Sequence, residues 1–220
     1  MTETVGRYYD TLPDGRVLIV SPLPDGADES AARVLWQDAD EITPDQRKKI
    51  FAICGEIAIW SGHDKELVRK VQTADFLRAN IERLQMSALS LAIGQCDKGT
   101  ASLFIDFLVN FCLENDVPTS RPLQEYADDV ERFTYAALLH KRCVICGRKA
   151  DLHHVQAIGM GFNRNTKPQL GAMVLPLCRE HHTEYHNIGG TAFDAKYHVQ
   201  AVPMDKRIAG KYNISGKAAS

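Results

Sequence analysis

Three short stretches decide the fold: Cys143-Val-Ile-Cys146, then Asp151-Leu-His153-His154-Val155, and finally Leu177-Cys178-Arg-Glu-His181-His182-Thr-Glu-Tyr-His186. They contain three of the six cysteines and five of the eight histidines in the 220-residue chain. A CxxC pair with Gly147 behind it presents two thiolates from one tight turn. Cys178 and His181 stand three residues apart at an expected helix start, so their side chains share one helical face.

This spacing predicts a structural zinc ion held by Cys143, Cys146, Cys178 and His181. A domain this small gains much of its folding free energy from such a metal. His182 is also within reach of Cys178 on a helix, so the fourth ligand stays open between His181 and His182.

Four further histidines are then left for other work. His153 and His154 are neighbours on an expected strand, so their side chains point to opposite faces and take different roles. His182 and His186 are four residues apart on one helical face and suit a second metal. The alternative is that some of them only support the zinc ligands or fill the core.

Together, the three stretches resemble the HNH nuclease motif. The version here, with Gly159-Met160-Gly161 after the paired histidines and Lys196-Tyr197-His198 near the end, is similar to HNH nucleases encoded in phage and prophage recombination clusters. The resemblance implies a ββα-metal fold that hydrolyses DNA phosphodiester bonds with Mg²⁺ or Mn²⁺, or with Ni²⁺ or Zn²⁺ in their place. It implies that His153 and His182 bind this catalytic metal, that His186 is a further ligand, and that His154 is the general base.

Two positions depart from the family pattern. The asparagine that usually braces the loop is Met173 here, and the proline that commonly follows the histidine pair is missing. Asn163 or Asn165 is the candidate to serve instead. Candidates for phosphate contact are Arg164, Lys167 and Arg179, each of which is equally well explained as plain surface.

The charge is distributed unevenly along the chain. Residues 1–134 carry 14 Lys and Arg against 23 Asp and Glu, whereas residues 135–220 carry 12 against 5. A basic C-terminal part is typical of contact with a polyanion, although a solvated surface explains it equally well. Because the chain has neither a long apolar run nor a basic and apolar leader, we expect a cytoplasmic protein without membrane contact. Cysteines in that compartment favour metal binding or core packing over disulfides.

The N-terminal part predicts a small sheet followed by helices. Turn sequences at 12–15 and 22–26 border the β-branched run 17–20, and a second apolar stretch covers 34–36. Thr43, Pro44 and Gln46 predict a helix start with a capping box. Further helices are expected over 65–91, 100–113 and 124–140, with a proline-containing linker at 115–123 and buried thiols at Cys54, Cys96 and Cys112.

Residues 42–56 resemble the first main helix of the lambda Orf (NinB) recombination mediator family, and the similarity extends into 98–117. The resemblance implies a DNA-binding module that works with single-strand-binding protein and forms a homodimer. The alternative is a helical domain that only supports the nuclease. We therefore expect an α+β protein with a mediator-like domain at 1–120 and a zinc-stabilised HNH domain at 121–220.

The leading hypothesis is a metal-dependent DNA endonuclease acting in phage-type recombination. One rival is a non-catalytic DNA-binding mediator whose zinc unit only docks on DNA. Another is a zinc-stabilised protein-interaction module with no affinity for DNA. The paired His153 and His154 favour the nuclease, because a purely structural zinc knuckle has no use for them.

Overall fold

The computed structural model describes residues 7–11, 17–20, 40–86, 88–92, 95–155 and 170–214, which belong to two compact units, Met1–Trp36 and Gln37–Ser220. In the first unit, β1 (Arg7–Thr11) and β2 (Val17–Val20) pair antiparallel, and the register shifts between Tyr8 and Asp10. The strand expected over 17–20 is therefore confirmed. The predicted turns at 12–15 and 22–26 and the apolar stretch at 34–36 lie outside the described residues.

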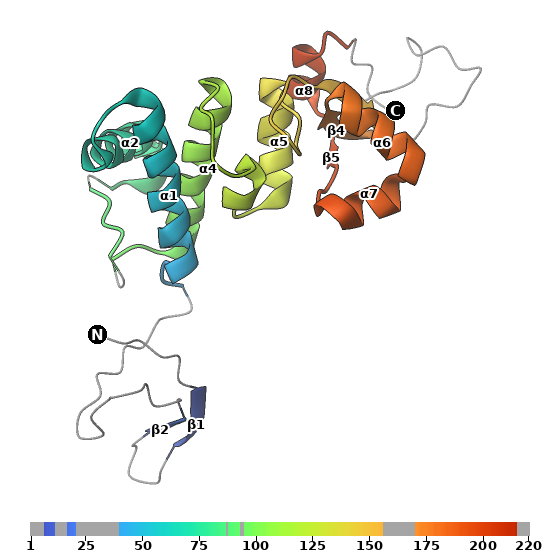
Figure 1. Ribbon diagram of the computed structural model, residues 1–220. Helices are drawn as coiled ribbons and strands as arrows, with labels where there is room; N and C mark the ends of the chain where they lie inside the picture. The colour runs from blue at the N-terminus through green and yellow to red at the C-terminus, as the bar shows by residue number, and fades with distance from the viewer. Residues whose placement is uncertain are drawn as a thin grey trace. The chain divides into compact units, whose positions relative to one another are not determined.

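The second unit is a set of helices followed by a small sheet with its own helices (Figure 1). Its strands β3, β4 and β5 form one antiparallel sheet in that order. The expected α+β class is confirmed. In chain order the elements are α1 (Pro44–Ser61), α2 (Lys65–Ala79), α3 (Ile81–Leu84), α4 (Lys98–Glu114), η1 (Leu123–Tyr126), α5 (Val130–His140), β3 (Asp151–His154), β4 (Met173–Leu177), α6 (Arg179–Ile188), α7 (Gly190–Tyr197), β5 (Val202–Pro203) and α8 (Lys206–Lys211).

Helix α1 begins as its sequence predicts. The Thr43 hydroxyl accepts from the Gln46 backbone N–H at 3.1 Å, and the Gln46 side-chain oxygen accepts from the Thr43 N–H at 3.1 Å. Pro44 fits the first helical position, where its missing N–H costs nothing. The helix ends at Gly62, whose φ of 72° closes it in the left-handed conformation that glycine adopts freely.

Two of the expected helices have different bounds. The helix expected to reach residue 91 ends at Leu84, because Asn80 ends α2 and only the short α3 follows it. The helix expected over 124–140 is broken into η1 and α5. Asp129 accepts from the Arg132 N–H at 2.9 Å and so caps a new helix where a continuous one was predicted.

The hydrophobic core runs through the whole second unit. Ile50, Phe76, Phe104 and Leu108 are fully buried where α1, α2 and α4 meet. The same core continues through α5 to β4, α6 and α7. It also contains three buried thiols, whose pKa values burial raises to about 11 or 12, as expected for packing residues that bind no metal: Cys54, Cys96 and Cys112.

The segment between α4 and α5 is tied to α1. Ser120 and Tyr126 both donate a hydrogen bond to the Glu56 carboxylate, the second at 2.8 Å. Further along, Asp128 accepts from Gln46 at 2.7 Å and from Lys49 at 3.2 Å. The predicted linker is thus packed against the helices, and a domain boundary near residue 120 stays a prediction.

Helix α5 positions the site. It lies between α4 on one side and the small sheet on the other, as Figure 1 shows. Strand β4 then runs directly into α6, so the sheet and the histidine-rich helix are joined at Cys178. Among the described residues, no helix is both long and apolar enough to cross a bilayer.

Candidate metal centres

The CxxC pair forms a tight turn between α5 and β3. The Gly147 N–H donates to the Cys143 carbonyl at 2.9 Å, and the Cys143 N–H donates to the Arg148 carbonyl at 2.7 Å. Gly147 has a φ of 70°, which a residue with a side chain adopts only with strain. The turn is held to the sheet by the Val144 N–H, which donates to the Pro176 carbonyl at 3.0 Å.

Four ligand atoms converge beside this turn: the sulfurs of Cys143, Cys146 and Cys178 and Nδ1 of His181. The Cys146 and Cys178 sulfurs are 3.7 Å apart. His181 Nδ1 lies 3.5 Å from the Cys143 sulfur and 3.2 Å from the Cys178 sulfur.

These separations fit a tetrahedral zinc site. With zinc–sulfur bonds of about 2.3 Å and zinc–nitrogen bonds of about 2.0 Å, the edges of the tetrahedron are about 3.8 Å between sulfurs and about 3.5 Å from sulfur to nitrogen. Three thiolates and one imidazole are also the donors that zinc prefers. Of the two histidines left open by the sequence, the structure places His181 beside the cysteines and His182 elsewhere.

A second cluster consists of His153, His182 and His186, with one ring nitrogen of each within 4.8 Å of the others. The Nε2 atoms of His182 and His186 are 3.2 Å apart, one helical turn from each other on α6. His153 comes from β3 and is 3% exposed. Its Nε2 is buried without a hydrogen-bond partner among the described residues, as expected of a ring that awaits a cation.

His154 lies apart from this cluster. It pairs with Val174 across the sheet, whereas His153 pairs with Leu175. Directly opposed residues of an antiparallel pair share a face, so His154 is on the Val174 face, which packs on Leu138 and Met204. The alternation expected of the histidine pair is present. His154 is half-buried, and β3 is one of the two edge strands of the described three-stranded sheet.

The comparison with protein families agrees with this geometry. A family model described as "Putative HNHc nuclease" matches residues 21–214, which is most of the chain. The chain belongs to this HNH nuclease family. No curated protein and no solved structure matches it. The match supports the HNH resemblance, whereas the likeness of the N-terminal helices to recombination mediators stays a prediction.

Burial favours the neutral form of three histidines in these clusters of the HNH protein. It lowers the pKa of His153 to about 4, and the nearby rings of His182, His186 and His154 add to the effect. Burial likewise lowers the pKa of His181 and of His182. A neutral imidazole is the form that binds a metal, so these lowered pKa values favour the ligand form of His153, His181 and His182 at neutral pH.

Two supporting residues of the HNH site were missed in the sequence. The Tyr185 ring packs on the His153 ring with centroids 4.2 Å apart. Tyr185 follows His181 by four residues, which is about one helical turn. This spacing places Tyr185 on the helical face of a proposed ligand, and it could have identified Tyr185 as a supporting residue. The second is Arg148, which lies against the thiolates and carries no such signal.

Other predicted positions of the HNH motif are only partly described. Met173, which replaces the usual asparagine, lies on β4, and its carbonyl accepts from the Val155 N–H at 2.9 Å. The loop that follows the histidine pair therefore starts with a backbone hydrogen bond at this position. The remaining positions lie outside the described residues: Gly159 to Gly161, Asn163, Arg164, Asn165 and Lys167.

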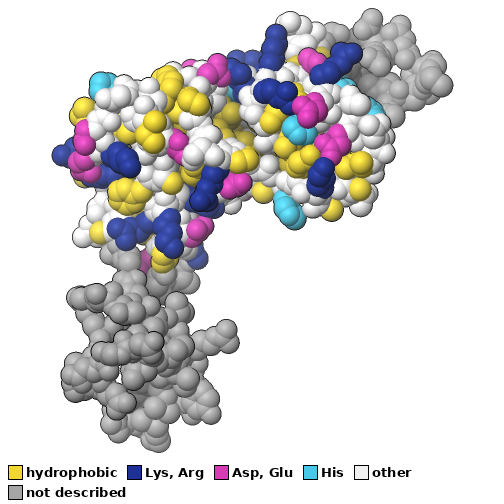
Figure 2. Space-filling model, in the orientation of Figure 1, with side chains coloured by type: hydrophobic (Ala, Val, Ile, Leu, Met, Phe, Trp, Pro, Cys, Tyr) yellow, Lys and Arg dark blue, Asp and Glu magenta, His cyan; other side chains and the backbone are white. Residues whose placement is uncertain are grey.

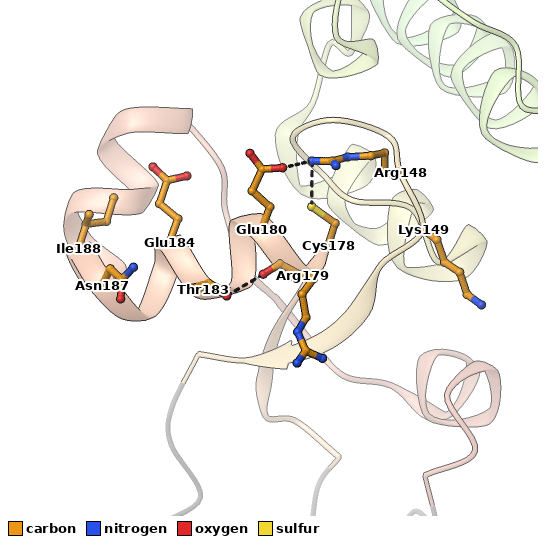
Figure 3. A pocket seen from close by; sticks show the side chains of 9 residues that line it. All are labelled: Arg148, Lys149, Cys178, Arg179, Glu180, Thr183, Glu184, Asn187 and Ile188. Carbon is orange, nitrogen blue, oxygen red and sulfur yellow. Dashed lines mark hydrogen bonds and ion pairs between the residues drawn. The ribbon is translucent and has the colours of Figure 1, made fainter.

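A wide surface hollow lies on the solvent side of α6, beside the thiolate cluster (Figure 3). Arg148 and Lys149 line it from the turn, and Glu180, Thr183 and Asn187 line it from the helix. None of the three clustered histidines lines it. It is therefore a feature of the cysteine side of the domain, and the three-histidine cluster lies on another face of α6.

Proposed function

We propose that this chain is a metal-dependent DNA endonuclease. The observation that carries the proposal is that α6 contributes to two separate clusters, one rich in thiolates and one made only of imidazoles. A zinc knuckle needs four ligands and no more. The second cluster therefore has its own purpose, and family membership supports phosphodiester hydrolysis as that purpose.

In this proposal Cys143, Cys146, Cys178 and His181 hold a structural zinc ion. His153, His182 and His186 hold the catalytic divalent cation. Imidazole nitrogens suit Mn²⁺, Ni²⁺ or Zn²⁺ as well as Mg²⁺. When bound, this cation supplies positive charge that stabilises the scissile phosphate and the leaving oxygen.

His154 is proposed as the general base that takes a proton from the attacking water. Because His154 follows the ligand His153 but projects to the other face, it does not compete for the cation. Its strand, β3, lies at an edge of the described sheet. The His154 ring would therefore contact the attacking water at this edge. The hydrolysed phosphodiester would lie across the same edge.

The DNA backbone would be held by exposed cations. Arg179 begins α6 close enough to His182 for its charge to affect that ring. Lys and Arg side chains also gather near the ends of α5 and α8, with acidic side chains among them (Figure 2). The described cations at these helix ends are Lys141, Arg142, Lys206, Arg207 and Lys211.

The part of the proposal that concerns phage-type recombination rests on the N-terminal helices. Their resemblance to the mediator family suggests contact with single-strand-binding protein and a homodimer. One observation favours the rival, a non-catalytic DNA-binding mediator: His154 lies outside the three-histidine cluster. Under that rival hypothesis the protein binds both metals and DNA but does not cleave DNA.

The deciding experiment is a cleavage assay with metal-stripped protein reloaded with one equivalent of zinc. Supercoiled, single-stranded and branched DNA are each incubated with added Mg²⁺ or Mn²⁺. Cleavage that needs the added cation supports the nuclease. Binding of DNA without cleavage, under every cation tested, supports the mediator instead.

A further inference from the structure

The three sulfurs of the proposed zinc cluster differ in their exposure to solvent. The Cys143 sulfur is buried. Cys146 is exposed, whereas Cys178 is buried but borders the surface hollow. These two sulfurs therefore need another partner when they are thiolates.

Arg148 is that partner. Its Nε donates to the Cys146 sulfur at 3.3 Å, and its Nη2 lies 3.7 Å from the Cys178 sulfur. The same guanidinium forms an ion pair with the Glu180 carboxylate on α6, and Figure 3 shows it between that carboxylate and the Cys178 sulfur. One rigid fork thus spans two ligands that come from different segments of the chain.

The negative charge of the proposed zinc cluster explains why a contact with Arg148 stabilises it. Three thiolates, one neutral imidazole and Zn²⁺ carry a net charge of −1, and Glu180 adds a second negative charge nearby. A guanidinium between them offsets one of the two negative charges, is attracted to both, and donates hydrogen bonds along fixed directions.

We propose that Arg148 is a positioning residue of the zinc centre, which clamps the Cys146 and Cys178 thiolates together and slows the loss of the metal. This inference rests on the proposed zinc site. It assigns no role to Arg148 in DNA cleavage, so it can be tested without substrate.

The test measures how fast an excess of a zinc-binding dye removes zinc from the full chain. Arg148→Gln should release zinc about 10- to 100-fold faster than wild type, as is typical when a group that hydrogen-bonds a metal ligand is lost. Arg148→Lys should fall between the two, because an ammonium restores the charge but cannot span both sulfurs.

Two neighbours in the hollow provide the controls. Lys149→Gln removes an adjacent cation that Figure 3 shows pointing away from Cys178, and its release rate should stay at that of wild type. Glu180→Gln breaks the ion pair but leaves the contacts of Arg148 with sulfur, so its rate should also stay near wild type. The cobalt-loaded form of Arg148→Gln should keep its thiolate-to-cobalt absorption, which shows that all three sulfurs still bind.

Three results would overturn the inference. Wild-type release from Arg148→Gln, with an unchanged cobalt spectrum, would show that the contact is incidental. Equal acceleration in Glu180→Gln and Arg148→Gln would assign the effect to the surface ion pair. If Arg148→Gln fails to fold, Arg148→Lys provides the test instead. A rate of zinc release from Arg148→Lys equal to that of wild type would then reject the clamp. A wild-type chain that holds no zinc would reject the zinc site itself, which is a distinct failure.

Discussion

The aromatic ring of Tyr185 lies against the ring of His153, with centroids 4.2 Å apart and planes inclined by 59°. Tyr185 is 6% exposed and packs in turn on Phe193. The orientation of His153 therefore depends on an aromatic contact between β3 and α6. Space for Tyr185 is left by Gly190, because a Cβ at that position would overlap the tyrosine hydroxyl.

The first prediction tests this contact. Gly190→Ala should push Tyr185 against His153 and lower the rate of cleavage, by on the order of 100-fold if the ring moves by about 1 Å. Zinc content should not change, because Gly190 contacts none of the four zinc ligands. The matched control is Gly210→Ala on α8, where a Cβ meets nothing within 4 Å. Equal rates for the two variants would show that the packing of Tyr185 does not matter.

The second prediction separates two adjacent histidines. His181→Ala should lose zinc and lower the melting temperature sharply, because lost ligation is lost folding free energy. His182→Ala should keep its zinc and its melting temperature but lose activity. Metal analysis and thermal melts check both. Cys143→Ser should behave as His181→Ala does, and full zinc content in that variant would contradict the ligand set.

The third prediction concerns the proposed base. His154→Ala should lower cleavage by about 10²- to 10⁴-fold while zinc content and DNA affinity stay near wild type. His153→Ala should also lose activity, but high Mn²⁺ should partly restore it, since that loss weakens only cation binding. His154→Ala should resist this rescue. If it cleaves as fast as wild type, the base is another group.

The fourth prediction concerns acid stability. Burial lowers the pKa of His140; the negative charge of Glu114 opposes this shift, whereas the positive charges of Lys211 and Arg142 add to it. As the pH falls below about 6.5, the unfolded chain takes up a proton at His140 before the folded chain does, so stability is lost. His140→Gln should remove this contribution.

Thermal melts of zinc-loaded protein from pH 7.5 to 5.5 check the effect of His140→Gln. As the pH falls, the melting temperature of His140→Gln should decrease less than that of wild type. His63→Gln, at an exposed histidine in the turn after α1, is the control and should follow wild type throughout. A constant difference between His140→Gln and wild type would mean that His140 does not contribute.

Local patterns predicted more of this molecule than long-range ones. The capping box at Thr43, the CxxC turn and the spacing of Cys178 and His181 are all set by interactions within a few residues, and all three occur in the structure. The break before α5 was missed because helical periodicity alone does not reveal that Asp129 caps a new helix. Arg148 was missed because its meeting with Cys178 depends on how two distant segments pack.

The single peptide step from His181 to His182 joins the two metal clusters, since one ring faces the thiolates and the other faces His153 and His186. The backbone of a helix is stiff over one residue, so a shift of α6 moves both rings together. Affinity for the two ions should therefore be linked, and thermodynamics requires each ion to change the affinity for the other by the same factor. We expect the zinc ion to act as an effector of the catalytic cation in addition to stabilising the fold.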